Sequence, residues 1–241
     1  MPRFYCPTPL IPGLAVDLPA HVAHHMHVLR LQPGAELRLF NGDGAEYLAH
    51  LDSVDKRRAG ATVKAQVARD VELPYEVTLA QALPEASKMD WIIEKAVELG
   101  VAAIQPLAAT RCVVRLTGER AEKKAAHWQG VIIAASEQSG RNRLARLAPV
   151  DDFHAWTAQQ ALHKRIILSP RAGQSLADWA KHQPPQAIAL MVGPEGGFTA
   201  QEEDAAVKHG ALTLAMGPRI LRTETAALAA LAALGALWGA M

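Results

Sequence analysis

Residues 188–199 read Ile-Ala-Leu-Met-Val-Gly-Pro-Glu-Gly-Gly-Phe-Thr, and residues 216–225 read Met-Gly-Pro-Arg-Ile-Leu-Arg-Thr-Glu-Thr. The first stretch is a short apolar run that predicts a buried strand ending in a glycine-rich turn. The second is a polar turn that leads into an almost uncharged final helix. Ligands of open α/β sheets bind beyond the carboxyl ends of the strands. The two turns therefore predict one ligand pocket that is built from backbone.

The turn from Gly193 to Gly197 favours a bound ligand over a simple connection between a strand and a helix. Its three glycines lack a Cβ, so the backbone can approach a planar ligand and expose its N–H and C=O groups. The turn is not a Walker A loop, which needs Gly-Lys-Ser/Thr, and it is not a G-x-G-x-x-G fingerprint. These differences argue against the usual ATP and NAD sites and leave the ligand open.

The segment from Ile220 to Thr225 adds polar side chains beside the same strand ends. Thr223 is predicted to be the N-cap of the final helix, and Glu224 suits the positive end of the helix dipole. Good capping explains these two residues. It does not explain Arg222, whose guanidinium could hold a phosphate or a developing negative charge.

The hydrophobic pattern divides the chain of 241 residues into two parts. Residues 1–72 alternate polar and apolar positions around an Asn41–Gly44 turn, which predicts a small barrel-like β domain with one helix. Residues 73–241 alternate strand and helix patterns, which predicts an α/β domain whose parallel sheet has helices on both faces. Strands are expected at 36–40, 46–51, 61–67, 77–83, 101–107, 165–169, 188–192 and 211–216, and helices at 20–30, 87–99, 119–136, 175–181, 199–209 and from 223 onward.

Three local signals mark helix ends in the second part. Ser87 is expected to cap one helix with its side chain, and Gly100 suits the left-handed position at the end of that helix. Thr199 and Glu202 have the spacing of a capping box, which predicts the start of another helix.

Composition excludes several classes of protein. The net charge is +1, but residues 111–146 hold eight Lys or Arg against three Glu, a local excess of five that could meet phosphate or be a solvated helix face. The two cysteines lack a motif, and no signal peptide is apparent, which fits a reducing cytoplasm. The longest uncharged run, 226–241, is shorter than the ~18 residues of a membrane span and predicts a buried or interface helix.

Histidines at positions 21, 24, 25 and 27 raise the question of a metal. No cysteine or acidic ligand lies nearby in the sequence, and the His-Glu-x-x-His pattern of zinc enzymes is absent. We therefore expect no metal site and assign these histidines to the surface or the core of a helix.

Taken in order, these motifs resemble the bacterial 16S ribosomal RNA uridine-N3 methyltransferases (RsmE family), which belong to the SPOUT class. The resemblance covers essentially the whole chain, and no motif of the family is broken. It is carried by Arg3-Phe4, His24 with Val28-Leu-Arg30, Leu39-Phe-Asn-Gly42, Lys88, Glu94-Lys-Ala-Val-Glu-Leu-Gly-Val101, Pro106-Leu107, Arg111, Glu137-Gln-Ser-Gly-Arg-Asn-Arg143, Leu168-Ser-Pro-Arg171, Gly193-Pro-Glu-Gly-Gly197 and Gly217-Pro-Arg-Ile-Leu-Arg-Thr-Glu-Thr225.

The resemblance implies a PUA-like β-barrel that binds RNA over residues 1–72 and a SPOUT methyltransferase domain over residues 73–241. It implies a trefoil knot in the second domain, which is an exception to the usual rule that chains are unknotted. It also implies S-adenosylmethionine as the cofactor, a homodimer as the active unit, and a uridine of 16S rRNA in the small ribosomal subunit as the substrate. The implied location is the cytoplasm, with no membrane partner.

The same resemblance assigns roles to individual residues. Arg222 is expected to stabilise charge on the target base, and Glu224 to handle or orient a proton. The expected cofactor contacts are Leu168, Ser169, Val192, Gly193, Pro194, Glu195, Gly196, Gly197, Met216, Gly217, Ile220, Leu221 and Thr225. The expected RNA contacts are Arg3, Arg30, Lys88, Arg111, Arg141 and Arg143.

Two rival functions remain open on the sequence. One is an RNA-binding protein that keeps the pocket without catalysis, although the intact glycine turn speaks against it. The other is an enzyme that uses the same turns for a different nucleotide or a phosphate ligand. Binding of S-adenosylmethionine separates both from a methyltransferase.

Overall fold

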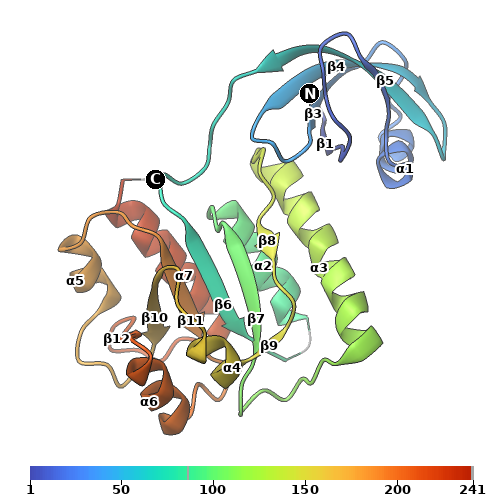
Figure 1. The fold of residues 1–241 in the computed structure, drawn as a ribbon. Coiled ribbons are helices and arrows are strands. Elements are labelled where there is room, and N and C mark those ends of the chain that lie inside the picture. The colour runs from blue at the N-terminus through green and yellow to red at the C-terminus, as the bar shows by residue number, and fades with distance from the viewer. Residues whose placement is uncertain (86, 240–241) are drawn as a thin grey trace. The chain divides into compact units, whose positions relative to one another are not determined.

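The computed structural model describes residues 1–85 and 87–239 and contains two compact units (Figure 1). Unit 1 comprises Met1–Glu72 and Ser136–Leu144, and unit 2 comprises Leu73–Ala135 and the chain from Ala145 onward. The sequence-based boundary after residue 72 is also a boundary between the units. Residues 136–144, which that boundary assigns to the second domain, pack with the first.

Unit 1 is built on a five-stranded sheet with the order β1-β3-β4-β5-β2. β1 pairs with β3 in parallel, and the other neighbouring strands are antiparallel. The three predicted strands are confirmed, while the two three-residue strands were missed because they are too short to show a period. The elements are β1 (Arg3–Tyr5), β2 (Ala15–Asp17), α1 (Ala20–Val28), β3 (Glu36–Phe40), β4 (Glu46–Val54) and β5 (Ala59–Val67).

The core of unit 1 follows from the alternation along its strands. Leu37 and Leu39 on β3 and Leu51 on β4 are fully buried. They pack in one cluster with Phe4 of β1 and Met26 of α1. Because successive strand residues point to opposite faces, this alternation fixes which face of the sheet is covered.

A buried carboxylate, Glu46, lies at the start of β4 with 0% of its side chain exposed. It accepts hydrogen bonds from Arg3 Nε at 3.1 Å and Arg69 Nη1 at 3.4 Å, and it pairs with Arg38 as well. A carboxylate removed from water is stable only when it is paired and hydrogen-bonded. Three guanidinium groups meet that requirement here.

The same arginine cluster fastens residues 136–144 to the strands of unit 1. The Arg3 side chain donates to the carbonyl oxygens of Ser136 at 2.8 Å and Arg141 at 2.7 Å, and also to the side chain of Asn142. Arg141 in turn pairs with Glu72 through both carboxylate oxygens. Hydrogen bonds to charged groups therefore explain why this segment belongs to unit 1.

Unit 2 contains a parallel sheet with the order β12-β10-β11-β6-β7-β8, and β9 also pairs with β7. Every strand pair is parallel, which confirms the prediction from the alternating pattern. β11 is buried at all of its positions, as expected for a central strand covered on both faces. The strands are β6 (Val77–Ala82), β7 (Ala103–Ala108), β8 (Arg146–Leu147), β9 (Asp151–Asp152), β10 (Lys164–Leu168), β11 (Ile188–Val192) and β12 (Leu212–Leu214).

The helices of unit 2 form two groups around this sheet (Figure 1). α7 packs against α2 and α5 and against β11, and α4 packs against α6. None of the helices in residues 1–85 and 87–239 is long and apolar enough to cross a membrane. The helices are α2 (Lys88–Glu98), α3 (Gly118–Ser139), α4 (Phe153–Ala158), α5 (Leu176–Lys181), α6 (Ala200–Lys208) and α7 (Thr223–Leu237).

All three predicted helix ends of unit 2 are at the expected residues, but one lacks its expected side-chain hydrogen bond. Thr199 and Glu202 form the capping box of α6, and Gly100 follows α2 with a φ of 89°. Ser87 occupies the N-cap position of α2 but makes no capping hydrogen bond with its side chain. The short helix α4 was not predicted, although Asp152 caps it with its carboxylate.

Glu46→Gln is expected to destabilise unit 1, because it leaves the buried guanidinium of Arg3 without its counter-charge. Loss of one partner from a buried ion pair costs about 3 kcal/mol of unfolding free energy. Hydrogen exchange of the β3–β5 amides measures the loss. All five tryptophans lie in unit 2, so tryptophan fluorescence should report an unchanged transition. Glu36→Gln, at an exposed position 4.0 Å from His50, is the matched control, and an equal loss in both variants would contradict the prediction.

Candidate functional site

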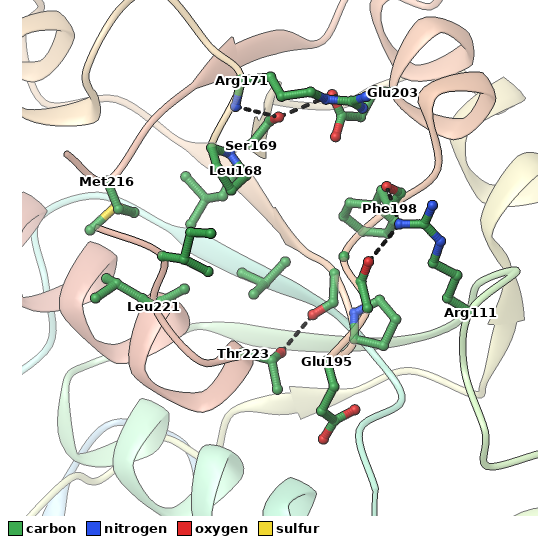
Figure 2. A pocket seen from close by; sticks show the side chains of 18 of the residues that line it. Arg111, Leu168, Ser169, Arg171, Glu195, Phe198, Glu203, Met216, Leu221 and Thr223 are labelled. Carbon is green, nitrogen blue, oxygen red and sulfur yellow. Dashed lines mark hydrogen bonds and ion pairs between the residues drawn. The ribbon is translucent and has the colours of Figure 1, made fainter. Parts of the chain in front are cut away.

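A cavity of about 370 Å³ opens beyond the carboxyl ends of β10 and β11 (Figure 2). Its volume lies in the range of small-molecule sites, and its position is the one where α/β sheets bind ligands. The lining comes from the segments that follow β7, β10, β11 and β12 and from residues of α6 and α7. It consists of Arg111, Leu168, Ser169, Pro170, Arg171, Val192, Gly193, Pro194, Glu195, Gly196, Gly197, Phe198, Glu203, Met216, Gly217, Arg219, Ile220, Leu221, Thr223 and Ala226.

The loop after β11 is folded so tightly that its glycines are required. A Cβ on Gly193 would lie 2.9 Å from the backbone nitrogen of Phe198 and 3.0 Å from Cα of Gly197. Gly197 has a φ of +67° and donates its N–H to the carbonyl of Pro194 at 2.8 Å. The loop therefore presents main-chain atoms to the cavity, as the sequence indicated.

The hydroxyl of Thr223 joins three separate parts of unit 2. It donates to the carbonyl oxygen of Gly193 at 2.6 Å and accepts from Nε2 of Gln81 at 2.9 Å (Figure 2). The prediction that Thr223 is an N-cap is wrong, since Arg222 holds the N-cap position and makes no side-chain capping bond. The hydroxyl cannot cap the helix because it is used to fix the ligand loop instead.

A second wall of the cavity is held by the segment that follows β7. Arg111 donates from Nη1 to the carbonyl of Gly196 at 2.6 Å, and the N–H of Thr110 donates to Glu202 at 2.7 Å. Burial would raise the pKa of Glu202, but the donors on Thr110 and Thr199 outweigh it and hold the pKa below its usual value. Glu202 therefore stays an anion that anchors both its own helix and this wall.

One end of the cavity carries a compact polar group. Ser169 Oγ donates to Glu203 Oε2 at 3.0 Å, and Arg171 Nη2 lies 2.9 Å from the same oxygen (Figure 2). The N–H of Arg171 donates back to Ser169 Oγ at 3.2 Å. The positive and negative charges at this end therefore offset each other.

Glu195 lies at the opposite end in Figure 2, and its carboxylate points away from the cavity. It accepts from Lys88 Nζ at 2.5 Å and from the N–H of Glu85 at 3.1 Å. Burial acts to raise the pKa of Glu195, but these donors outweigh it and lower the pKa. Nearby, Glu224 Oε2 and Gln81 Oε1 are buried and have no hydrogen-bond partner within residues 1–85 and 87–239.

The structure brings most of the predicted cofactor residues together. All of them except Thr225 line the cavity, and Thr225 is exposed on α7. Arg222 and Glu224 do not line it but lie in the first turn of the helix that does. The sequence missed several lining residues, namely Pro170, Arg171, Phe198, Glu203, Arg219, Thr223 and Ala226. Five of these lie within the quoted motifs and Ala226 directly follows one, whereas Glu203 carries no signal of its own beside the capping Glu202.

The six predicted RNA contacts fall into three classes. Arg30, Arg111 and Arg143 are exposed. Arg3 and Arg141 have side chains only 8% and 4% exposed, and their donors are used inside unit 1. Lys88 forms the ion pair with Glu195.

Comparisons with known proteins agree with this geometry. A family described as an RNA methyltransferase domain matches residues 71–235, and an RNA methyltransferase PUA domain matches residues 18–64. The Bacillus subtilis protein named ribosomal RNA small subunit methyltransferase E is 36% identical over 220 residues, covering 88% of this chain and 86% of that protein. Its Mycobacterium tuberculosis namesake is 35% identical, covering 89% and 83%.

Two solved structures are similar to the whole chain. One is a ribosomal RNA small subunit methyltransferase E from Neisseria gonorrhoeae bound to S-adenosyl methionine, with 41% identity, a TM-score of 0.92, and coverage of 99% and 98%. The other is a methyltransferase from Legionella pneumophila in complex with the same cofactor, with 36% identity, a TM-score of 0.91, and coverage of 97% and 96%.

Thr223→Val is expected to lower the unfolding free energy of unit 2 by about 1–3 kcal/mol, because it keeps the shape of the side chain but removes its hydrogen bonds. The Gly193 carbonyl would then lose this donor, and the Gln81 amide would keep only its hydrogen bond to the carbonyl of Ala82 at 2.9 Å. Urea denaturation followed by tryptophan fluorescence measures the change. Thr225→Val, at an exposed position two residues further along α7, is the matched control. Equal stability of the two variants would show that the Thr223 hydroxyl does not hold the loop.

Proposed function

The chain belongs to the ribosomal RNA small subunit methyltransferase E family, and we infer that it transfers a methyl group from S-adenosylmethionine to N3 of one uridine in 16S ribosomal RNA. It is an S-adenosylmethionine-dependent ribosomal RNA methyltransferase. Within the molecule, the inference is carried by a single feature, the cavity that three backbone loops form at the carboxyl ends of β10 and β11.

The residues around the cavity fit S-adenosylmethionine. The side chains of Leu168, Val192, Met216 and Leu221 give it apolar walls, which suit a planar adenine. The Gly193–Gly197 loop offers main-chain N–H and C=O groups at close range for the polar edges of adenosine. We propose that these residues, with Ser169, Gly217 and Ile220, hold the nucleoside part of the cofactor.

Methylation at N3 sets three demands on the protein. The N3–H of uracil is a weak acid, so the proton must be accepted, N3 must be held in line, and the negative charge on the uracil oxygens must be stabilised. The bound cofactor supplies an electrophilic methyl group on sulfur. Arg222, exposed at the N-cap of α7, is proposed to stabilise the charge, and Glu224 in the first turn is proposed to accept or orient the proton.

The RNA contacts are proposed to come from exposed cations. Arg30 and Arg143 lie on unit 1, and Arg111 lies at the wall of the cavity in unit 2. Guanidinium groups bind phosphate with several donors in one plane, which suits them to an RNA backbone. Arg3 and Arg141 are proposed to support this surface from inside unit 1 rather than to touch RNA.

The remaining features follow from the family. We propose that the active unit is a homodimer, that the small ribosomal subunit is the partner, and that the protein works in the cytoplasm. The trefoil knot stays a prediction of the family resemblance.

Binding and product analysis test the proposed function directly. Calorimetry should detect binding of S-adenosylmethionine and of S-adenosylhomocysteine to the protein. ATP should not bind, because the Gly193–Gly197 loop lacks the lysine and the hydroxyl of an ATP site. Mass spectrometry of 16S rRNA from cells with and without the gene should show one N3-methyluridine that depends on it. Binding of neither sulfur compound, or an unchanged rRNA, would overturn the proposal.

Arg222→Ala is expected to lower kcat by about 100-fold while leaving S-adenosylmethionine binding unchanged, because the side chain does not line the cavity. Single-turnover methyl transfer with saturating RNA measures the first effect, and calorimetry measures the second. Lys208→Ala, which removes an exposed cation from α6, is the control. Full activity of Arg222→Ala would exclude a catalytic role for this residue.

A further inference from the structure

Three charged side chains come from the loop that follows β11 and from two helices that pack together. Lys88 is the first residue of α2, Glu195 belongs to the loop, and Glu224 is the second residue of α7. α2 packs against α7, and Lys88 Nζ lies 2.5 Å from Glu195 Oε1. Glu224 makes no direct ion pair with Lys88, but it lies in the first turn of the helix that packs against α2, and its negative charge acts on the Lys88 ammonium.

We propose that this site receives the uracil ring, with Lys88 as a catalytic residue that stabilises the negative charge on a uracil oxygen while Glu224 takes the N3 proton. The proposal rests on the proposed function and goes beyond it, since Lys88 was expected to touch phosphate. It assigns the base to a place just outside the cofactor cavity, on the side of Glu195.

The hydrogen-bonding pattern of the site matches that of uracil. In uracil, the N3–H donor lies between two carbonyl oxygens that accept. A complementary site therefore has an acceptor for N3–H and a donor next to it for a carbonyl oxygen. Glu224 Oε2 is a buried acceptor without a partner within the described residues 1–85 and 87–239. A buried acceptor without a hydrogen bond destabilises the protein. A ligand that donates a hydrogen bond to this oxygen would remove the penalty. The Lys88 ammonium, on the helix α2 that packs against α7, is the proposed donor to a uracil oxygen.

The Lys88 ammonium has N–H donors that Glu195 does not use. An ammonium group has three N–H donors, and in the part of the chain that the structure describes only one of them is used, by Glu195. The side chain is 33% exposed, so a ligand can reach it. Glu195 thus fixes the position of the ammonium and leaves the remaining donors for a substrate oxygen.

The local charge favours a neutral base over a phosphate. Glu195, Glu224 and Glu85 all act on Lys88 with negative charge. A phosphate group would be repelled by these carboxylates, whereas an uncharged uracil would not. This environment separates Lys88 from Arg30, Arg111 and Arg143, which are exposed arginines of the RNA set.

The reaction moves a negative charge past Lys88, whose own charge stays constant. Before transfer, the ammonium faces the two carboxylates of Glu195 and Glu224 and a neutral uracil. The N3–H bond then breaks, the proton goes to Glu224, and the electron pair left on N3 forms the bond to the methyl carbon as the carbon–sulfur bond electrons return to sulfur. The negative charge moves from Glu224 to the uracil oxygens, and the cation remains beside it.

The pH dependence of the reaction is the readout that a structural role would not change. Hydrogen bonding to Glu195 raises the pKa of Lys88 above its usual value, so the ammonium stays charged throughout the assay range. A cation at the uracil oxygen lowers the pKa of N3–H in the complex. Removal of the Lys88 cation should therefore raise the pH at which kcat begins to increase.

Lys88→Met is the test variant, and Lys95→Met is its matched control. Lys95 lies on the same helix, is 34% exposed, and pairs with Glu94 and Glu98 at 2.7 Å. We expect Lys88→Met to lower kcat by about 100-fold, with unchanged affinity for S-adenosylmethionine and for RNA. RNA containing 5-fluorouridine, whose N3–H is more acidic, should recover most of this loss. Lys88→Arg, which keeps a cation, should keep more activity than Lys88→Met.

Each alternative role of Lys88 has its own signature in this experiment. A phosphate contact would raise KM for RNA and leave the pH profile unchanged, and a support for the loop would weaken binding of S-adenosylmethionine. Either result overturns the proposal, as does the same loss with 5-fluorouridine RNA. If Lys88→Met fails to fold, a Lys88→Arg variant with the pH profile of the wild type sustains the proposal, and one without activity overturns it. Wild-type protein that methylates no uridine N3 would instead refute the proposed function.

Discussion

The cofactor cavity depends on one hydroxyl group, that of Thr223. It ties the carbonyl of Gly193 to the side chain of Gln81, and so it fixes the loop after β11 to the strand β6 and to the start of α7. The Gly193–Gly197 loop presents main-chain atoms to the pocket, so the shape of this wall is the shape of the loop. The close approach of Gly193 to Phe198 leaves that loop little freedom, and the Thr223 hydroxyl selects where it lies.

Unit 1 contains a buried carboxylate that is stabilised by arginine side chains. Glu46 is buried, and its burial is tolerated because Arg3, Arg38 and Arg69 surround it. Arg3 then has donors left for the carbonyls of residues 136–144. A segment distant in the sequence is thereby joined to unit 1 by hydrogen bonds from Arg3.

The sequence predicted backbone features better than side-chain partners. Strand periodicity and the capping box of Thr199 depend on neighbours in the chain, and both are confirmed. The role of Thr223 was wrong because its partners lie 30 and 142 residues away, where no local pattern can reveal them. Arg3 looked like a phosphate contact for the same reason, since nothing nearby in the sequence marks Glu46 as its partner.

The two ends of the cavity differ in how their charges are used. At Ser169, the carboxylate of Glu203 is offset by Arg171, so this end offers polarity without a strong field. At Glu195, one ammonium lies among several carboxylates and a buried acceptor has no partner within the described residues. Backbone loops thus build the cofactor site, whereas side chains build the edge beside it. Substitutions at that edge can therefore change the rate of the reaction without changing the affinity for the cofactor.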